Sequence, residues 1–314
     1  MSNKISNNIL EAIGNTPLIK LNKITKDLNR NIYVKFEGLN PGGSIKTRAA
    51  LNIISDAEKK GLLSPASTIV EYTSGNQGIG LALVSAVLGY KCKIVMPECM
   101  SEERRRIVKA YGAEIISTDA STGTITEIFE RAKEKAEAIV ADNENHFLAH
   151  QFENPANSEA HYKGTAEEII DQMGDLALNA FIAAVGTGGT VTGCAHKLKE
   201  RYPNALIATA EPVDAPILSG GVILSHGQQG IGDGFIPNIL DTDCYERVVT
   251  VSDENAFSMS KRLAREEGIF CGISSGTNVC AAIEIARELP EGSNVVTICV
   301  DLGDRYLSVD EFTS

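Results

Sequence analysis

The sequence predicts an α/β protein whose mostly parallel sheets carry helices on both faces. Runs rich in β-branched and apolar residues alternate with helical patterns almost throughout the 314 residues. Strands flanked by helices of this length are typical of parallel sheets covered on both sides. A chain this long can bury a substantial core, and we expect two domains.

The first half alternates expected strands with expected helices. Residues 31–37 (NIYVKFE) have the β-branched and aromatic content of a strand. Residues 45–61 form an amphipathic pattern with a helical period, and Gly61 closes that helix. The alternation continues through strands at 68–73, 92–97 and 113–119, and through helices at 77–90, 101–112 and about 124–141.

The same alternation of strands and helices continues in the second half. No internal sequence repeat, low-complexity tract or linker interrupts it. Expected strands lie at 179–188, 205–212, 246–252 and 294–301, and expected helices at 190–202, 253–268 and 276–290. In an open parallel sheet, ligands bind beyond the carboxyl ends of the strands. Several loops at such positions are rich in Gly, Ser, Thr and Asn, so we expect the chemistry there.

The composition excludes several kinds of partner. The net charge is −12 and no Lys/Arg block occurs, so we expect no nucleic-acid partner. No apolar run approaches the roughly 20 residues of a membrane span, and residues 1–17 lack the apolar core of an export signal. Seven scattered cysteines without a C-x-x-C pair indicate buried reduced thiols, with no metal site. We therefore expect a cytoplasmic protein.

Lys46 is an unusual residue for the start of a helix. It follows two glycines in NPGGSIKTRAA, where the positive end of the helix dipole opposes a cation. Desolvation and that dipole would both lower the pKa of its amine, which favours Schiff-base formation. The alternative is an ordinary solvated lysine.

Two further loops have the composition of anion sites. EYTSGNQGIG joins a strand to a helix, where backbone N–H groups and hydroxyls suit a carboxylate or phosphate. An N-cap by Ser74 or Asn76 is the alternative. VGTGGTVTG can present a nest of N–H groups to a phosphate, or be a plain turn, but it matches neither the dinucleotide fingerprint nor a P-loop. Two anion loops and one reactive lysine together suggest pyridoxal phosphate.

The sequence resembles the cysteine synthase (O-acetylserine sulfhydrylase) family, which belongs to fold type II of the pyridoxal-phosphate enzymes. The resemblance runs nearly end to end. It is carried by IGNTPLIKL (13–21), NPGGSIKTR (40–48), TSGNQGIGLA (73–82), QFENPAN (151–157), GTGGTVTG (186–193), EPVDAPILSGG (211–221), GIGDGFIPNILD (230–241), GISSG (272–276) and GDRYLS (303–308).

This resemblance implies roles for individual residues. Lys46 would hold pyridoxal 5′-phosphate as a Schiff base, and Asn76 would hydrogen-bond the ring hydroxyl. The implied phosphate cradle is Gly186, Thr187, Gly188, Gly189 and Thr190. The implied site for the carboxylate of an amino-acid substrate is Thr73, Ser74, Gly75, Gln77 and Gln151. After release from the cofactor, Lys46 would remove the Cα proton, a group would leave Cβ, and a nucleophile would add to the resulting aminoacrylate.

The resemblance also implies the organisation of the chain. Two three-layer αβα domains are expected. Residues 1–44 and 151–314 would form a larger cofactor-binding domain, and residues 45–150 a smaller mobile domain that closes over the substrate. Related enzymes are homodimers. The sequence leaves open whether an acetyltransferase partner docks on this one.

Three departures from the family pattern surround the expected site. Gln77 and Thr47 replace a usual Thr and a usual Asp or Cys, and we interpret both as tolerated. Asp301 in VDLGDRYLS stands where a serine faces the pyridine nitrogen. A carboxylate there would favour the protonated ring. The alternative is that Asp301 only caps a helix.

A fourth departure, Asp233, bears on the reaction. In GQQGIGDGFIP (227–237) it replaces a small apolar residue of the synthases. A carboxylate would repel HS⁻ but could accept a proton from water. We therefore interpret the chain as an enzyme that releases hydrogen sulfide from L-cysteine and adds water to give L-serine, with Asp233 as the base. In a milder reading Asp233 binds the substrate ammonium or faces solvent.

Other functions stay open at this point. The first is a cysteine synthase that uses O-acetyl-L-serine and sulfide. The second is a non-catalytic regulatory protein, which the retained Lys46 disfavours. A nucleotide-dependent oxidoreductase is disfavoured because no G-x-G-x-x-G follows a strand.

Overall fold

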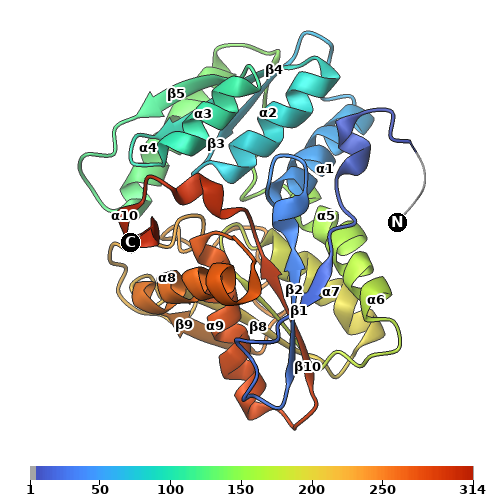
Figure 1. The fold of residues 1–314 in the computed structure, drawn as a ribbon. Helices are drawn as coiled ribbons and strands as arrows, with labels where there is room; N and C mark the ends of the chain where they lie inside the picture. Colours follow the sequence, from blue (N-terminus) through green and yellow to red (C-terminus); the bar gives the residue numbers. More distant parts are fainter. Residues whose placement is uncertain (1–4, 314) are drawn as a thin grey trace.

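The chain folds around two sheets, as seen in a computed structural model that describes residues 5–313 (Figure 1). The larger sheet has the order β1-β2-β10-β7-β8-β9, and only the β1–β2 pair is antiparallel. Its strands are β1 (Leu18–Lys20), β2 (Asn31–Phe36), β7 (Ala180–Ala184), β8 (Leu206–Pro212), β9 (Arg247–Val251) and β10 (Asn294–Cys299).

The smaller sheet is wholly parallel and has the order β5-β4-β3-β6. Its strands are β3 (Thr68–Tyr72), β4 (Lys91–Pro97), β5 (Glu114–Thr118) and β6 (His146–Leu148). Side chains alternate between its faces, so Ile69 packs with α1 (Lys46–Lys59), α2 (Asn76–Leu88) and α3 (Glu102–Ala110), while Val70 packs with α4 (Ile125–Ala141). The smaller sheet is thus the middle of three layers.

The larger sheet is covered in the same way. Ile182 of β7 packs with α8 (Asp253–Arg262) and α9 (Ile273–Glu288). The next residue, Ala183, points to the opposite face and packs with α6 (Ala166–Met173) and α7 (Gly189–Arg201). The expected α/β class, with two three-layer αβα units and mostly parallel sheets, is therefore confirmed. The domain boundaries after residues 44 and 150 stay a prediction.

Every strand and long helix expected from the sequence is present, but several short elements were not expected. They are β1, β6, α6, α5 (Ala156–Ala160), η1 (Ile9–Ala12), η2 (Glu37–Leu39), η3 (His161–Thr165), η5 (Gly303–Tyr306) and α10 (Asp310–Thr313). The helix expected over 253–268 changes at its end to the π-helical turn η4 (Leu263–Glu267). Elements of three to eight residues span too few periods to show an apolar pattern.

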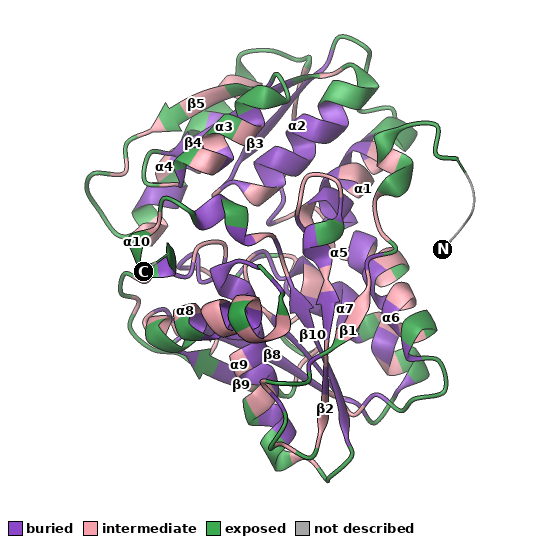
Figure 2. Ribbon diagram, in the orientation of Figure 1, coloured by how far each residue is buried: buried purple, intermediate pink, exposed green. Residues whose placement is uncertain are grey.

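Burial follows this layered plan (Figure 2). α2 is buried at every residue from Gln77 to Ser85, because it packs on β3 and β4 with α1 and α3 beside it. The expectation of buried thiols holds for Cys92, Cys194, Cys271 and Cys299. It is wrong for Cys99, which is exposed, and Cys244 and Cys280 are half-buried.

Residues 1–4, the start of the segment in which no export signal is expected, lie outside the described residues. Within residues 5–313, none of the helices combines the length and the apolar content that a membrane crossing needs.

Candidate active site

Loops that follow the carboxyl ends of β3, β7 and β10 line one cavity. It contains most residues that the sequence places in the site: Lys46, Thr73, Ser74, Asn76, Gln77, Gln151, Gly186, Thr187, Gly188, Thr190 and Asp233. Gly75, Gly189 and Asp301 lie behind this lining. A single cavity therefore gathers residues that are up to 187 positions apart, from Lys46 to Asp233.

Lys46 is the first residue of α1, and its amine points at the 186–190 loop. Lys46 Nζ donates a hydrogen bond to Thr187 Oγ1 at 3.2 Å. The side chain is half-buried because it lines the cavity, and the surrounding protein keeps it from bulk water. This burial lowers the pKa of Lys46 to about 8, although Asp233 and Glu71 oppose the shift. The amine is therefore neutral in a useful fraction of molecules near neutral pH.

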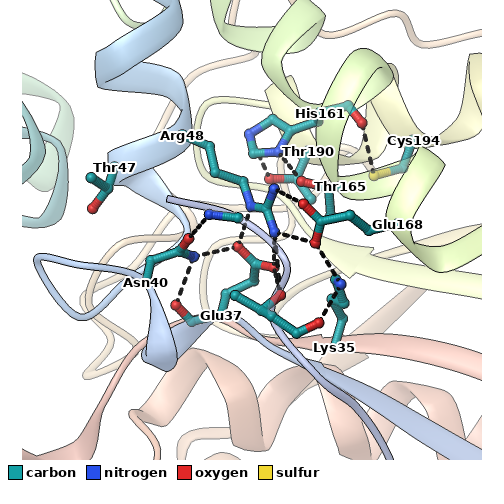
Figure 3. Close-up of polar contacts among 12 residues, drawn as sticks. Lys35, Glu37, Asn40, Thr47, Arg48, His161, Thr165, Glu168, Thr190 and Cys194 are labelled. Atoms are coloured by element: carbon teal, nitrogen blue, oxygen red, sulfur yellow. Dashed lines mark hydrogen bonds and ion pairs between the residues drawn. The ribbon is translucent and has the colours of Figure 1, made fainter. Parts of the chain in front are cut away.

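The start of α1 is held by a buried ion cluster rather than by a cap (Figure 3). Ile45, at the N-cap, makes no side-chain capping bond. Two residues after Lys46, Arg48 forms ion pairs of 2.6 Å with both Glu37 and Glu168. Burial alone would raise the pKa of Glu168, but Arg48, with help from a second cation, lowers it to about 2. The first turn of α1 is thus tied to η2, directly after β2, and to α6.

A second cation completes this cluster. Lys35 Nζ donates to Glu168 Oε2 at 2.7 Å and to Thr16 O at 2.6 Å. Lys35 and Glu37 are fully buried and Arg48 is nearly so. Two cations and two carboxylates therefore balance inside the protein, which is the condition under which buried charges are tolerated.

The 73–77 loop has the features of a carboxylate site. Gly75 adopts φ +141°, and a Cβ there would collide with the side chain of Arg104. Gln77 is 1% exposed, and neither polar atom of its amide has a partner within residues 5–313. Because an unpaired buried amide is costly, this group is suited to a ligand. Gln151 lies beside the loop and donates to Tyr72 O at 3.0 Å.

The 186–190 loop has the features of a phosphate cradle. It leads into the N-terminus of α7, where free N–H groups favour an anion. Gly186 and Gly189 are needed because a Cβ would meet Gly230 O and the Asn157 amide. Asn157 donates to Thr187 Oγ1 at 3.0 Å, and its own Oδ1 is buried without a partner. The close backbone approach and the unpaired oxygen fit a bound polar group here.

Buried neutral His161 supports the far end of this loop (Figure 3). Its Nε2 lies 3.4 Å from Thr190 Oγ1, and its Nδ1 lies 3.0 Å from Thr165 Oγ1. Burial, together with Lys46 and Arg48, lowers the pKa of His161 well below its usual value. An uncharged imidazole therefore orients the Thr190 hydroxyl.

Asp301 is connected to the site through Asn76. Its Oδ2 accepts from Asn76 Nδ2 at 2.7 Å and from Tyr306 OH at 2.9 Å, and its Oδ1 is buried without a partner. Arg305 Nη1 donates to Asn76 Oδ1 at 2.5 Å. Neither Asp301 oxygen caps the following turn, whose N-cap is Leu302 and lacks a side-chain bond. The free oxygen is compatible with a ring donor, and that contact stays a prediction.

Asp233 lies in an irregular segment that brings its carboxylate to the cavity. Gly232 at φ +68° and Gly234 at φ +90° flank it, in a region that favours glycine. Asp233 is 8% exposed, and none of the described residues donates a hydrogen bond to its carboxylate. Burial raises the pKa of Asp233 to about 6, although the charges of Lys46 and His226 oppose the shift.

Sequence reasoning missed several residues of this cavity. Glu71 lies behind the lining, accepts from Gln151 N at 3.0 Å, and has a pKa that burial raises to about 8. Other lining residues without an assigned role are Arg104, Phe152, Gln229, Ile231, Ser274 and Asn278. Ser274 stands in GISSG, a block already singled out. Arg104 sits in a charged helical run, where nothing in the sequence sets it apart.

Comparisons with known proteins show the family of the chain. The family described as "Pyridoxal-phosphate dependent enzyme" matches residues 9–301. The chain is 47% identical over 308 residues to the cysteine synthase of Staphylococcus aureus (strain Mu50 / ATCC 700699), which covers 98% of this chain and 97% of that relative. It is 46% identical over 309 residues to a probable cysteine synthase of Bacillus subtilis (strain 168), with 98% of each covered.

Two solved structures are informative. A hydrogen sulfide-producing enzyme from Fusobacterium nucleatum has a TM-score of 0.91 and 42% identity, covering 96% of this chain and 100% of its own. The second is an aspartate-to-asparagine mutant of a hydrogen sulfide-producing enzyme, solved with an α-aminoacrylate intermediate. It has a TM-score of 0.90 and 37% identity, covering 97% and 91%. The chain therefore belongs to the cysteine synthase family of fold type II enzymes, which depend on pyridoxal phosphate.

Proposed function

We propose that this enzyme converts L-cysteine and water into L-serine and hydrogen sulfide. The proposal depends mainly on Asp233. Its carboxylate is buried at the cavity, beside Lys46, and none of the described residues donates a hydrogen bond to it. A structural role would give such a carboxylate partners. A carboxylate kept free is suited to accept a proton.

The loops described above support the assignment of the cofactor and substrate residues. Gly186 to Thr190 would hold the phosphate of pyridoxal phosphate, Lys46 would bind its aldehyde carbon, and Asn76 would face its ring hydroxyl. Thr73 to Gln77, with Gln151, would hold the substrate carboxylate. When bound, pyridoxal phosphate withdraws electrons from the Cα of an attached amino acid.

Two protein groups would then move protons. Neutral Lys46, with its pKa near 8, accepts the proton from Cα. The C–S bond at Cβ breaks, and the sulfur leaves as hydrogen sulfide once it has gained a proton. Asp233, ionised above pH 6, takes one proton from water while the water oxygen bonds to Cβ. Lys46 then returns its proton to Cα, and the proton that Asp233 took from water balances the one gained by the departing HS⁻. The thiol of L-cysteine is thereby exchanged for the hydroxyl of L-serine.

The negative charge of Asp233 also favours this direction. An anionic HS⁻ that approached Cβ would meet the buried carboxylate of Asp233, where like charges repel more strongly than in bulk water. Neutral water meets no such barrier. Support also comes from the hydrogen sulfide-producing structural neighbours, one of which carries an aspartate-to-asparagine replacement in its aminoacrylate complex.

Cysteine synthesis from O-acetyl-L-serine and sulfide is the second candidate. It is favoured by the names of the relatives at 46–47% identity. The same cavity serves both reactions, because they differ in the group that leaves Cβ and the nucleophile that adds. Asp233 decides between them in our proposal.

Product identification tests the proposal. The holoenzyme is incubated with L-cysteine alone, and serine and sulfide are quantified. We expect equal amounts of both products, and a fall in serine formation of about 10²-fold or more in Asp233→Asn. Asp243→Asn, at an exposed position of the same loop region, is the control and should match the wild type. If no serine forms while O-acetyl-L-serine plus sulfide gives cysteine rapidly, the enzyme is a synthase.

By the same resemblance, we propose a homodimer that works in the cytoplasm on a small amino-acid substrate. Sedimentation of the holoenzyme tests the oligomeric state: a mass of one 33.6 kDa chain would contradict a dimer.

A further inference from the structure

The segment that carries Asp233 has no regular structure to hold it. Residues 227–234 contain Gly230, Gly232 and Gly234, all with positive φ. On the side of the larger sheet, Gln228 fixes the segment: its Nε2 donates to Val251 O at 2.9 Å. Glycine-rich backbone has many accessible conformations, so the position of Asp233 depends on such contacts.

Helices α3 and α4, which pack on the smaller sheet, supply contacts on both sides of Asp233. Before it, Arg104 Nη1 of α3 donates to Gln229 Oε1. After it, Thr126 Oγ1 of α4 donates to Gly234 O at 3.3 Å. The carboxylate is therefore held between two hydrogen bonds that come from helices of the other layered unit.

Arg104 is an unusual residue to find in such a contact. It is 1% exposed, its Nε has no partner, and no carboxylate of the described residues forms an ion pair with it. Its guanidinium lies 4.6 Å from the centre of the Tyr306 ring. Burying an unpaired cation is costly, and an apolar side chain would pack here at lower cost. We infer that the guanidinium of Arg104 is present for its hydrogen bond to Gln229, which an apolar side chain could not donate.

The path of the Arg104 side chain shows what it joins. Its methylene groups lie across Gly75, where any Cβ would collide with them, in the loop proposed to hold the substrate carboxylate. Its tip reaches Gln229, four residues before Asp233. One rigid side chain thus spans from the carboxylate loop to the segment of the proposed base.

We propose that Arg104 is a positioning residue, which holds the Asp233 segment over the cavity through Gln229 and links it to the 73–77 loop. This inference rests on the proposed role of Asp233. The effect on the reaction would be selective: loss of the contact would leave Lys46 in place and move the group that activates water.

Hydrogen–deuterium exchange of the holoenzyme tests the contact without any assay of activity. In Arg104→Gln and in Gln229→Ala we expect amides of residues 227–237 to exchange about tenfold faster, as when one hydrogen bond to a loop is lost. The double variant should exchange no faster than either single variant, because both changes remove the same contact. Arg104→Lys should restore part of the protection. Exchange unchanged in Gln229→Ala, or equally raised throughout the chain, would overturn the proposal.

Two controls keep the result interpretable. Arg106→Gln changes an exposed arginine of the same helix. Among the described residues this arginine pairs only with Glu102, so the variant should leave residues 227–237 unchanged. Gln229 is half-buried, so Gln229→Ala tests the contact even if variants of the buried Arg104 fail to fold.

The pH profile separates positioning from general damage. Lys46 and His226 are the basic groups near Asp233. If the segment loosens, Asp233 gains water, and the acid limb of serine formation should shift to lower pH, while uniform damage would lower the rate without a shift. Absence of serine from the wild type would refute the proposed function alone, since the exchange data would still decide the contact.

Discussion

Lys46 and Asp233 share one cavity but are held in opposite ways. Lys46 begins a 14-residue helix whose first turn is fixed by the ion cluster of Lys35, Glu37, Arg48 and Glu168. Asp233 lies between glycines in an irregular segment, held by single hydrogen bonds from other elements. The group proposed to bind the cofactor sits on a rigid element. The group proposed to select the nucleophile sits on a loop, where it can be exchanged without rebuilding the fold.

Lys46→Ala should give the largest effect. It removes both the amine proposed to bind pyridoxal phosphate and the group proposed to accept the Cα proton. We expect turnover of L-cysteine to fall by at least ~10³-fold. Borohydride treatment followed by mass spectrometry checks the cause: a pyridoxyl group should be found on residue 46 of the wild type and be absent from the variant. A tether elsewhere in the chain would contradict the assignment of Lys46.

Arg48→Met disrupts the ion cluster that fixes the first turn of α1. The variant leaves Glu37 buried without its cation, so the free energy of unfolding should fall by about 3–5 kcal/mol. Denaturant titration measures this loss. Arg106→Met removes an exposed i,i+4 pair and should cost about 0.5 kcal/mol or less. Equal losses in the two variants would show that the cluster does not brace α1.

Much of this arrangement follows from the sequence, because it depends on local patterns. Strand and helix periodicity predicts the layered fold, and glycines before Lys46 and around residues 186–190 indicate loops that are expected to bind ligands. Positions such as Asp233 are found only because they depart from a family pattern.

The ion cluster and the contact of Arg104 could not be predicted. Their members lie far apart in the chain, as Arg48 and Glu168 do, and each charged member is an ordinary residue of a helix or strand. Gln229, the partner of Arg104, is a neutral residue of a loop. Which charges become buried, and which pair, depends on how helices dock on the two sheets. No periodic pattern of a single segment contains that information. β6 and α6 were missed for the simpler reason that they are short.

Asp233→Asn should have the opposite effect on stability from Arg48→Met. In the cofactor-free chain, burial raises the pKa of Asp233 to about 6, so the folded state holds a proton that the unfolded state loses between roughly pH 4 and 6. Wild-type stability therefore falls as the pH rises through this window, by up to about 3 kcal/mol. The asparagine variant avoids this cost, as is common when a functional group is removed.

Unfolding at several pH values measures this difference. Asp233→Asn should be more stable than the wild type above pH 6, and the gap should close below pH 4. Asp243→Asn, which is exposed, should show no such trend. A gap that does not change with pH would mean that packing, and not the charge of Asp233, is responsible.

Gly234→Ala should give the smallest loss of stability. It tests how the irregular segment that carries Asp233 is held. At φ +90°, a Cβ costs about 1–2 kcal/mol from backbone strain alone. It would also collide with Thr126 Oγ1, so Thr126 must move and lose its bond to Gly234 O. Gly292→Ala is the matched control, because Gly292 has φ +80° and open space around its Cβ position. The excess loss of stability over Gly292→Ala isolates the Thr126 contact. If that excess is absent and serine formation is unchanged, the Asp233 segment does not depend on α4 for its position.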